Sequence, residues 1–161
     1  MANGNGNGNG KPLKKVRIDD LLTIQPITDN QKIIYDAYKD DKHLLLHGIA
    51  GTGKTFLSLY LALEEVLDPS TVYEDVFIVR SVVSTRDIGF LPGDEQEKVS
   101  IYEAPYRSIC RELFGIKDSY DALKQQGNIK FMSTSFIRGI TINNAIIIVD
   151  ECQNLNFHEL D

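Results

Sequence analysis

The chain has 161 residues, enough for one domain, and its 42% hydrophobic and 25% charged residues are ordinary for a soluble globular protein. The net charge of −6 provides no bulk positive field for nucleic acid, and the longest unbroken apolar run, Ala145 to Val149, is too short to span a bilayer. Two cysteines, Cys110 and Cys152, without a recognisable signal peptide or zinc-ligand spacing, indicate reduced thiols in a cytoplasmic protein.

The N-terminal end differs in composition from the rest of the chain. Residues 1–10 are an Asn-Gly alternation, which has nothing to bury and predicts disorder. Four basic residues follow, and they indicate a solvated flank or, as the alternative, an arm that touches nucleic acid: Lys11, Lys14, Lys15 and Arg17. We therefore expect a tail and flank over residues 1–20 and a domain over residues 21–161, with packing beginning near Ile24.

The first predicted helix starts at a capping box. Thr28 has the spacing of an N-cap residue, and Gln31 has the spacing of the partner that reaches back to it. One helical face then carries Ile33, Ile34, Ala37 and Tyr38. A short apolar run, Leu44 to His47, predicts the first strand.

The octapeptide GIAGTGKT, Gly48 to Thr55, lies between this strand and the next predicted helix and has the spacing of a phosphate-binding loop (P-loop, Walker A motif). Its glycines let successive backbone N–H groups form an anion-binding concavity, and the following helix directs its positive dipole end to the same place. Lys54 is expected to reach the β- and γ-phosphates, and the Thr55 hydroxyl to ligate Mg²⁺. The nucleotide-binding residues predicted here are Gly48, Ile49, Ala50, Gly51, Thr52, Gly53, Lys54 and Thr55.

Downstream of this loop, helices and strands alternate. The predicted elements are a helix to about Leu67 stopped by Asp68-Pro69, a strand over Val76–Val79, a loop over Arg86–Asp94, a helix from Val99 to Leu113 with Pro105 at a kink or a fresh first turn, a helix over Ser119–Gln126, a weak strand over Ile129–Met132 and a strong one over Ala145–Val149. This alternation predicts an α/β fold with a parallel sheet.

The last strand ends in two adjacent acids. Ligands of open parallel sheets lie beyond the carboxyl ends of the strands, so both carboxylates are expected beside the phosphate-binding loop. We expect Asp150 to hold Mg²⁺ opposite Thr55, and Glu151 to orient and polarise the water that attacks the γ-phosphate (Walker B motif). A solvated turn or a helix N-cap is the structural alternative. Gln153 has a spacing that could let it face the γ-phosphate, or it is simply an exposed polar residue.

The chain resembles the PhoH family of P-loop ATPases, which share the RecA-type core of superfamily-1 helicases. The resemblance rests on GIAGTGKT, on VRSVVSTRDIGFLPGDEQEK and on FIRGITINNAIIIVDECQN, and it covers about Gln25 to Leu155. It implies that Gln31 reads adenine, that Gly48–Thr55 bind phosphate, and that Asp150, Glu151 and Gln153 take the metal-binding, water-activating and sensing positions. Cys152 stands where the family usually has alanine. A phage origin would suit so compact a relative.

The resemblance also implies parts that are missing after the acidic motif. In the family a further strand, carrying a polar sensor, lies between the phosphate-loop strand and the acidic strand, and later segments provide an arginine. Four or five buried apolar side chains at roughly 1.5–3 kcal/mol each are comparable to the net stability of a domain, about 5–15 kcal/mol. We therefore expect the chain alone to be marginally folded and a poor ATPase. None of Arg80, Arg86, Arg107, Arg111 and Arg138 is identifiable as an arginine finger from spacing.

The leading interpretation is an ATP-binding protein and Mg²⁺-dependent ATPase of PhoH type. Coupling to RNA or DNA and assembly into a homo-oligomeric ring are implied by the family alone. The alternatives are a nucleotide-binding module that is catalytically incomplete, and a nucleoside kinase similar to the thymidine kinases that pair a phosphate loop with a D-E-x-Q segment.

Overall fold

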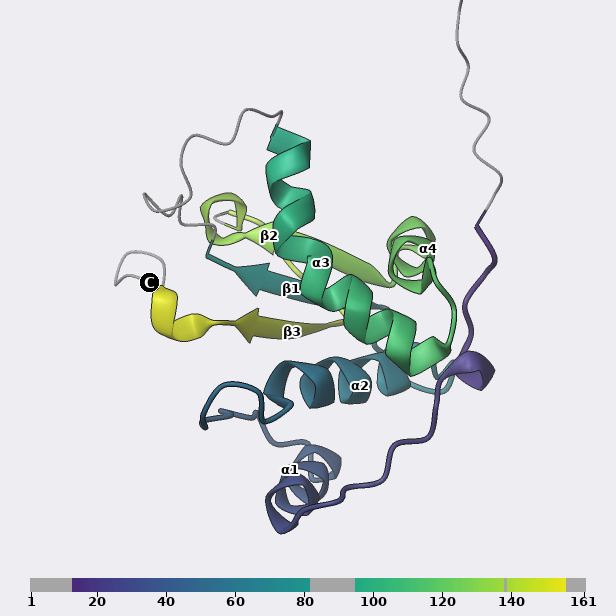
Figure 1. The fold of residues 1–161 in the computed structure, drawn as a ribbon, viewed down its shortest axis with the longest axis vertical. Helices are drawn as coiled ribbons and strands as arrows, with labels where there is room; N and C mark the ends of the chain where they lie inside the picture. Colours follow the sequence, from purple (N-terminus) through teal and green to yellow (C-terminus); the bar gives the residue numbers. More distant parts are fainter. Residues whose placement is uncertain (1–12, 82–94, 138, 156–161) are drawn as a thin grey trace, which may run out of the picture.

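The computed structural model describes residues 13–81, 95–137 and 139–155 (Figure 1). The helices are α1 (Asp29–Lys39), α2 (Lys54–Val66), α3 (Glu95–Phe114) and α4 (Ser119–Gln126); the strands are β1 (Asp75–Arg80), β2 (Ile129–Ser133) and β3 (Ala145–Asp150); and three 3₁₀ turns are η1 (Ile18–Asp20), η2 (Thr134–Phe136) and η3 (Cys152–Asn154). The predicted loop over Arg86–Asp94 lies outside the described residues, as do Arg138 and residues 1–12.

The strands form one parallel sheet in the order β2-β1-β3. Strand β1 is central, with Val76 opposite Ile129 of β2 and Arg80 opposite Asp150 of β3. All three strands therefore end at the same edge of the sheet, and the loop before α2 lies at that edge (Figure 1). The predicted α/β class with a parallel sheet is confirmed.

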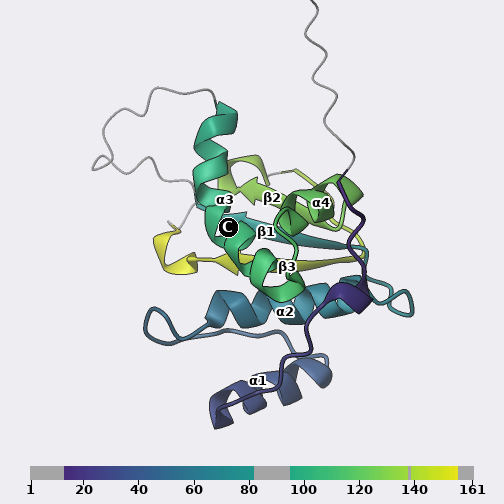
Figure 2. The ribbon, with the colours of Figure 1, turned by 45° about the vertical axis from the view of Figure 1, so that its right-hand side comes forward.

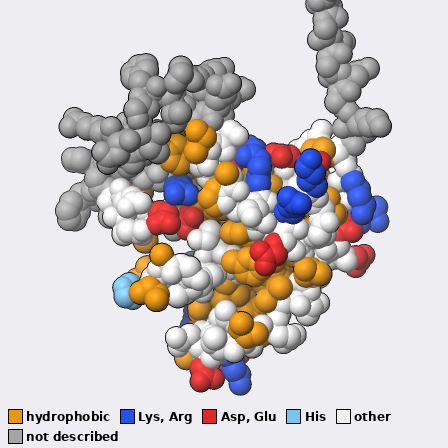
Figure 3. Space-filling model, in the orientation of Figure 1, with side chains coloured by type: hydrophobic (Ala, Val, Ile, Leu, Met, Phe, Trp, Pro, Cys, Tyr) orange, Lys and Arg blue, Asp and Glu red, His pale blue; other side chains and the backbone are white. Residues whose placement is uncertain are grey.

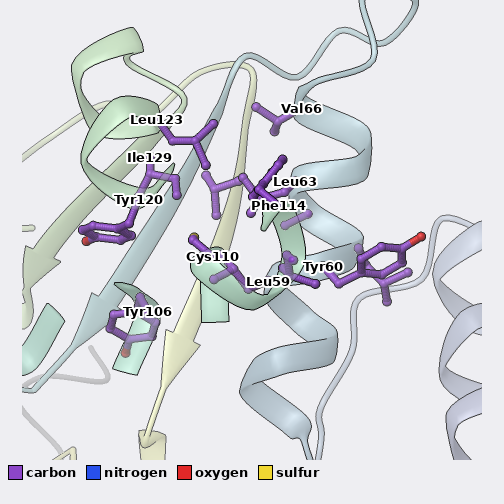
Figure 4. Close-up of a cluster of buried hydrophobic side chains, with 14 of the residues drawn as sticks. Leu59, Tyr60, Leu63, Val66, Tyr106, Cys110, Phe114, Tyr120, Leu123 and Ile129 are labelled. Carbon is purple, nitrogen blue, oxygen red and sulfur yellow. The ribbon is translucent and has the colours of Figure 1, made fainter. Parts of the chain in front are cut away.

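One face of the sheet, called here the covered face, is packed under helices. Val76 and Ile78 of β1 and Ile129 of β2 are buried there, with Ile146 and Ile148 of β3 partly buried. Helices α2, α3 and α4 contribute most of the other members of this cluster, among them Leu59, Leu63, Cys110, Phe114, Tyr120 and Leu123 (Figure 4). The continuous apolar sequence of β1 matches a strand whose residues are buried on both faces.

The opposite face is packed less densely at β3. Side chains alternate along a strand, so Ile147 and Val149 point away from the covered face. They are 48% and 47% exposed. Within the described residues β3 is also an edge strand, because its hydrogen-bonded neighbour is β1 alone.

Helix α1 starts where the sequence predicted, with one difference in its cap and one in its buried face. The Thr28 side chain accepts from the Gln31 N–H, as an N-cap should, but the Gln31 side chain accepts from the Ile27 N–H rather than from that of Thr28. The predicted apolar face is partly wrong: Ile33 is exposed, and Tyr35 is the buried residue of the helix. The Tyr35 hydroxyl donates to the Ile24 carbonyl, and its ring packs against that of Tyr60 at 6.2 Å between centroids.

The predicted strand over Leu44–His47 is wrong, since these residues form no strand in the structure. An extended segment becomes a strand only when it pairs, and β3 pairs with β1 instead. Leu45 is accordingly 89% exposed. The apolar composition of this segment predicts burial that the described residues do not provide.

Packing also begins earlier than the predicted start near Ile24. Val16 is buried, its N–H donates to the Gln126 side chain, and its carbonyl accepts from the same side chain. The Leu22 N–H donates to the Leu113 carbonyl. Figure 2 shows this segment running along α4 and the end of α3 before it reaches α1.

The long helix α3 is anchored to α4 by a buried charge. The Glu103 carboxylate accepts from the Tyr120 hydroxyl at 3.1 Å and forms ion pairs with Arg107 at 3.0 Å and Lys124 at 2.6 Å. A buried carboxylate is tolerated when it is paired and hydrogen-bonded in this way. Helix α3 runs unbroken through Pro105, so this proline does not begin a new helix.

Candidate functional site

The Gly48–Thr55 segment runs into the first turn of α2. Gly53 is the N-cap residue of α2 and has φ +80°, and Gly51 has φ +79°. Left-handed conformations of this kind are costly for residues with a Cβ, so glycine at both positions permits the tight path of the loop. Ile49, Ala50 and Thr52 are exposed along this path.

Lys54, the first residue of α2, turns back into the loop. Its ammonium donates to the carbonyl oxygens of Gly48 and Ile49, each at 2.9 Å, and to the Thr52 hydroxyl at 3.5 Å. The Thr52 hydroxyl donates in turn to the Ile49 carbonyl at 2.9 Å. The only cation of the octapeptide is therefore held within the concave path of the loop itself.

Thr55 and Asp150 are in direct contact although 95 positions separate them. The Thr55 hydroxyl donates to Asp150 Oδ1 at 3.0 Å. Thr55 lies in the first turn of α2 and Asp150 is the last residue of β3, so the fold brings the end of the loop to the end of the acidic strand. This juxtaposition is the one that the sequence predicted for these two residues.

Sequence reasoning missed a third residue at this contact. Tyr106 of α3, which lies within the helix predicted from Val99 to Leu113, donates its hydroxyl to Asp150 Oδ2 at 2.7 Å. Burial first, and the nearby Asp150 charge second, raise the pKa of this phenol, against a smaller lowering by Arg80. The helical spacing of apolar residues in α3 predicts that Tyr106 is buried, but no local signal names its partner 44 positions away.

Glu151 and Gln153 lie past the end of β3 and contact each other. Glu151 has φ +52°, a left-handed conformation uncommon for a residue with a side chain. The Gln153 side-chain amide donates to the Glu151 carboxylate. Gln153 is exposed and Glu151 half-buried.

Gln31 lies at a pocket that also reaches the glycine-rich loop. The pocket has a volume of about 150 Å³, and its lining comprises Ile24, Gln25, Pro26, Ile27, Gln31, Tyr35, Gly53, Phe56 and Leu57. Because the Gln31 side-chain oxygen accepts from the Ile27 N–H at 2.8 Å, the NH₂ group of the same amide is available as a donor. The pocket thus joins an apolar lining, the Gln31 amide donor and the N-terminal end of α2.

The arginines named from the sequence lie in different settings, and Arg111 is exposed in the last turn of α3. Arg107 is paired with Glu103 and Asp121, so its charge serves the α3–α4 contact. Arg80 lies at the end of β1 with its guanidinium carbon 5.8 Å from the centroid of the Tyr102 ring. Arg86 and Arg138 lie outside the described residues.

Comparison with known proteins gives a consistent result. A family model described as PhoH-like protein matches residues 23–161. Over 156 residues the chain is 34% identical to Protein PhoH2 of Bacillus subtilis, an alignment that covers 92% of this chain and 35% of that protein. It is 32% identical over 155 residues to a PhoH-like protein of Mycobacterium leprae, covering 92% of this chain and 43% of that protein.

The similarity extends to a third relative, Protein PhoH of Escherichia coli, at 34% identity over 110 residues, covering 67% of this chain and 30% of that protein. The chain therefore spans less than half the length of these relatives. In the part of the chain that the structure describes, none of the helices combines the length and the apolar character needed to cross a membrane.

Proposed function

The chain belongs to the PhoH-like protein family, which is P-loop ATPase-like, and on this premise we propose that it binds ATP together with Mg²⁺ and hydrolyses the γ-phosphate. The observation that carries the proposal is the 3.0 Å contact between the Thr55 hydroxyl and the Asp150 carboxylate. It brings the end of a glycine-rich loop to an acid at the carboxyl end of a parallel strand, which is where open α/β sheets bind their ligands.

The phosphate end of the ligand would lie in the Gly48–Thr55 loop. Backbone N–H groups at the start of α2 and the helix dipole favour an anion there. Lys54 supplies the positive charge, and its present partners are neutral carbonyl oxygens of Gly48 and Ile49. A phosphate oxygen is a stronger partner for an ammonium than a carbonyl oxygen, so Lys54 would exchange these contacts for the ligand.

The base would enter the pocket beside Gln31. At about 150 Å³ the pocket is smaller than the roughly 300–1,000 Å³ of sites that enclose a whole ligand, so it would receive one part of the nucleotide. Phe56 and Tyr35 provide apolar lining, and the Gln31 amide would donate to a ring nitrogen of the base. Gly53 lines the same pocket, which connects the base to the phosphate-binding loop.

The residues at the Thr55–Asp150 contact fit Mg²⁺. A hydroxyl and a carboxylate offer the oxygen ligands that Mg²⁺ takes, and Mg²⁺ in nucleotide sites uses one or two protein groups together with phosphates and water. The described residues contain no cluster of three His, Cys, Asp or Glu side chains that could hold a metal ion. When bound, the ion would neutralise charge on the phosphates.

Glu151 would orient the attacking water and accept its proton. The oxygen of that water forms a bond to the γ-phosphorus while the bond to the bridging oxygen of ADP breaks. Gln153, which donates to the Glu151 carboxylate, would hold this base in place and contact the γ-phosphate side of the site. Lys54 and the loop N–H groups would stabilise the developing charge.

The proposal is tested with two variants and two measurements. Binding of Mg-ATP is measured by calorimetry and phosphate release by a continuous assay, for the natural chain, Lys54→Ala and Glu151→Gln. We expect Lys54→Ala to weaken ATP binding at least about tenfold, because the ammonium–phosphate contact is lost. We expect Glu151→Gln to bind ATP normally. We expect it to release phosphate at least about 100-fold more slowly than the natural chain, because the general base is absent.

Two results would contradict the proposal in different ways. Equal ATP binding in the natural chain and in Lys54→Ala would exclude the glycine-rich loop as the phosphate site. Normal binding with no phosphate release from the natural chain would leave a nucleotide-binding module and remove the ATPase. Coupling to RNA or DNA and a homo-oligomeric ring stay predictions of the family resemblance, and a cytoplasmic location stays a prediction from the cysteines. The net charge of −6 lends nucleic-acid binding no support.

A further inference from the structure

Both carboxylate oxygens of Asp150 are held, and by different elements. Oδ1 accepts from the Thr55 hydroxyl of α2 at 3.0 Å, and Oδ2 accepts from the Tyr106 hydroxyl of α3 at 2.7 Å. A carboxylate can rotate freely about its last bond unless its two oxygens have distinct partners. Here the bonds from Thr55 and Tyr106 together fix the orientation of the carboxylate plane.

The position of Tyr106 follows from the way α3 crosses the sheet. Tyr102 and Tyr106 are four residues apart and therefore lie on one face of the helix. Tyr102 contacts Arg80 and Tyr106 contacts Asp150, and these two partners are themselves opposite each other at the ends of β1 and β3. One helical face thus contacts two neighbouring strand ends, as the arrangement of α3 over the sheet in Figures 1 and 2 allows.

Packing prevents Tyr106 from moving away. Its side chain is 1% exposed, and its ring centroid lies 5.9 Å from that of Phe131 in a tilted arrangement. From this fixed position the Tyr106 hydroxyl donates to Asp150 Oδ2 at 2.7 Å. A hydrogen bond to an ionised oxygen in a buried setting is among the stronger ones in proteins.

We infer that Tyr106 is a positioning residue for the cation end of the site: its hydroxyl holds Oδ2 of Asp150 and so directs Oδ1 toward Thr55 and the metal–phosphate group. The inference rests on the proposed function, because it names a residue that acts on the proposed Mg²⁺ ligand. It goes beyond that function in assigning to α3, which carries none of the predicted site residues, control over how tightly the divalent cation is held.

The chain offers a matched control in Tyr120. Tyr120 is also 1% exposed, and its hydroxyl also donates to a carboxylate, that of Glu103 at 3.1 Å. Figure 4 shows both tyrosines among the buried side chains. Tyr106→Phe and Tyr120→Phe therefore remove the same group from the same kind of environment, one at the site and one at the α3–α4 contact.

The experiment measures Mn²⁺ as the probe for the cation. Binding of Mn²⁺ in the presence of a non-hydrolysable ATP analogue is followed by electron paramagnetic resonance, and thermal unfolding is recorded without metal or nucleotide. We expect Tyr106→Phe to raise the dissociation constant of Mn²⁺ about tenfold while metal-free nucleotide binding is unchanged. We expect Tyr120→Phe to leave the dissociation constant of Mn²⁺ unchanged, although both variants lower the unfolding temperature.

The outcomes separate the inference from the function beneath it. Equal Mn²⁺ affinity in Tyr106→Phe and in the natural chain overturns the inference and leaves the proposed function standing. An equal loss of Mn²⁺ affinity in the two variants also overturns it, since the loss would then follow from destabilisation. Failure of the natural chain to bind Mn²⁺ with the ATP analogue removes the proposed function and the inference together.

Discussion

The two faces of the sheet differ in how completely they are packed. On the covered face, Leu63 of α2 and Cys110 of α3 are fully buried against β1. On the opposite face, Ile147 and Val149 of β3 remain about half exposed. The chain therefore has one well-formed core and, at β3, a second apolar surface that the described residues leave open.

The candidate site combines residues of elements that pack on the covered face with residues beyond the end of β3. Thr55 and Asp150 belong to elements that pack on the covered face, and their contact is already formed. Glu151 and Gln153 lie beyond the end of β3, where they contact each other. The metal-binding half of the site, Thr55 and Asp150, is thus better supported by the fold than the water-activating half, Glu151 and Gln153. On the face that Figure 3 shows, acidic and basic side chains lie interspersed around an apolar area over α2.

The largest expected effect compares the two thiols. Burial first, and Asp121 second, raise the pKa of Cys110 to about 12, which leaves roughly one thiol in ten thousand ionised at pH 8. Cys152 is exposed beside the candidate site. We expect an aromatic disulfide reagent at pH 8 to modify Cys152 at least about 100-fold faster than Cys110, as measured by mass spectrometry. Comparable modification rates of Cys110 and Cys152 would show that the covered face opens readily. The variant Cys110→Ser serves as the control, because it lacks the thiol that is expected to react slowly.

The second prediction compares truncations on the two faces. Leu63→Ala removes a side chain with 0% exposure and should lower the free energy of unfolding by about 2–5 kcal/mol. Ile147→Ala removes a half-exposed side chain and should cost at most about 1.5 kcal/mol. Urea denaturation of both variants measures the difference. A larger loss for Ile147→Ala would mean that the opposite face is covered in solution.

The smallest effect concerns the turn at Glu151. A left-handed residue with a side chain stores roughly 1 kcal/mol of strain, and asparagine tolerates this conformation better than most residues. Glu151→Asn should therefore be more stable than Glu151→Gln by a few tenths to about 1 kcal/mol in urea denaturation, while both lose phosphate release. Equal stability of the two variants would exclude backbone strain at this turn.

Much of the fold was predictable because its signals are local. The apolar run of β1, the strand before Asp150 and the helix that stops ahead of Asp68-Pro69 each depend on a few neighbouring residues, and the structure confirms them. The contact of Thr55 with Asp150 was predictable as well, because parallel strands end at one edge.

The remainder depends on partners distant in the sequence. Leu44–His47 has the composition of a strand, but strand formation requires a neighbour that the pattern cannot supply. Tyr35 replaces Ile33 on the buried face of α1, and its hydroxyl reaches the Ile24 carbonyl, a contact that no periodicity encodes. The bond from Tyr106 to Asp150 is of the same kind, since it joins a helix and a strand that the sheet brings together.

The contacts of Lys54 have a consequence for how a lysine variant is interpreted. A peptide unit is planar, and its C=O and N–H bonds point in opposite directions. By holding the carbonyls of Gly48 and Ile49, the ammonium also sets the orientation of the N–H groups of Ile49 and Ala50. Removing the lysine side chain therefore releases two peptide planes as well as one charge, so the affinity lost in Lys54→Ala measures the loop backbone and the cation together.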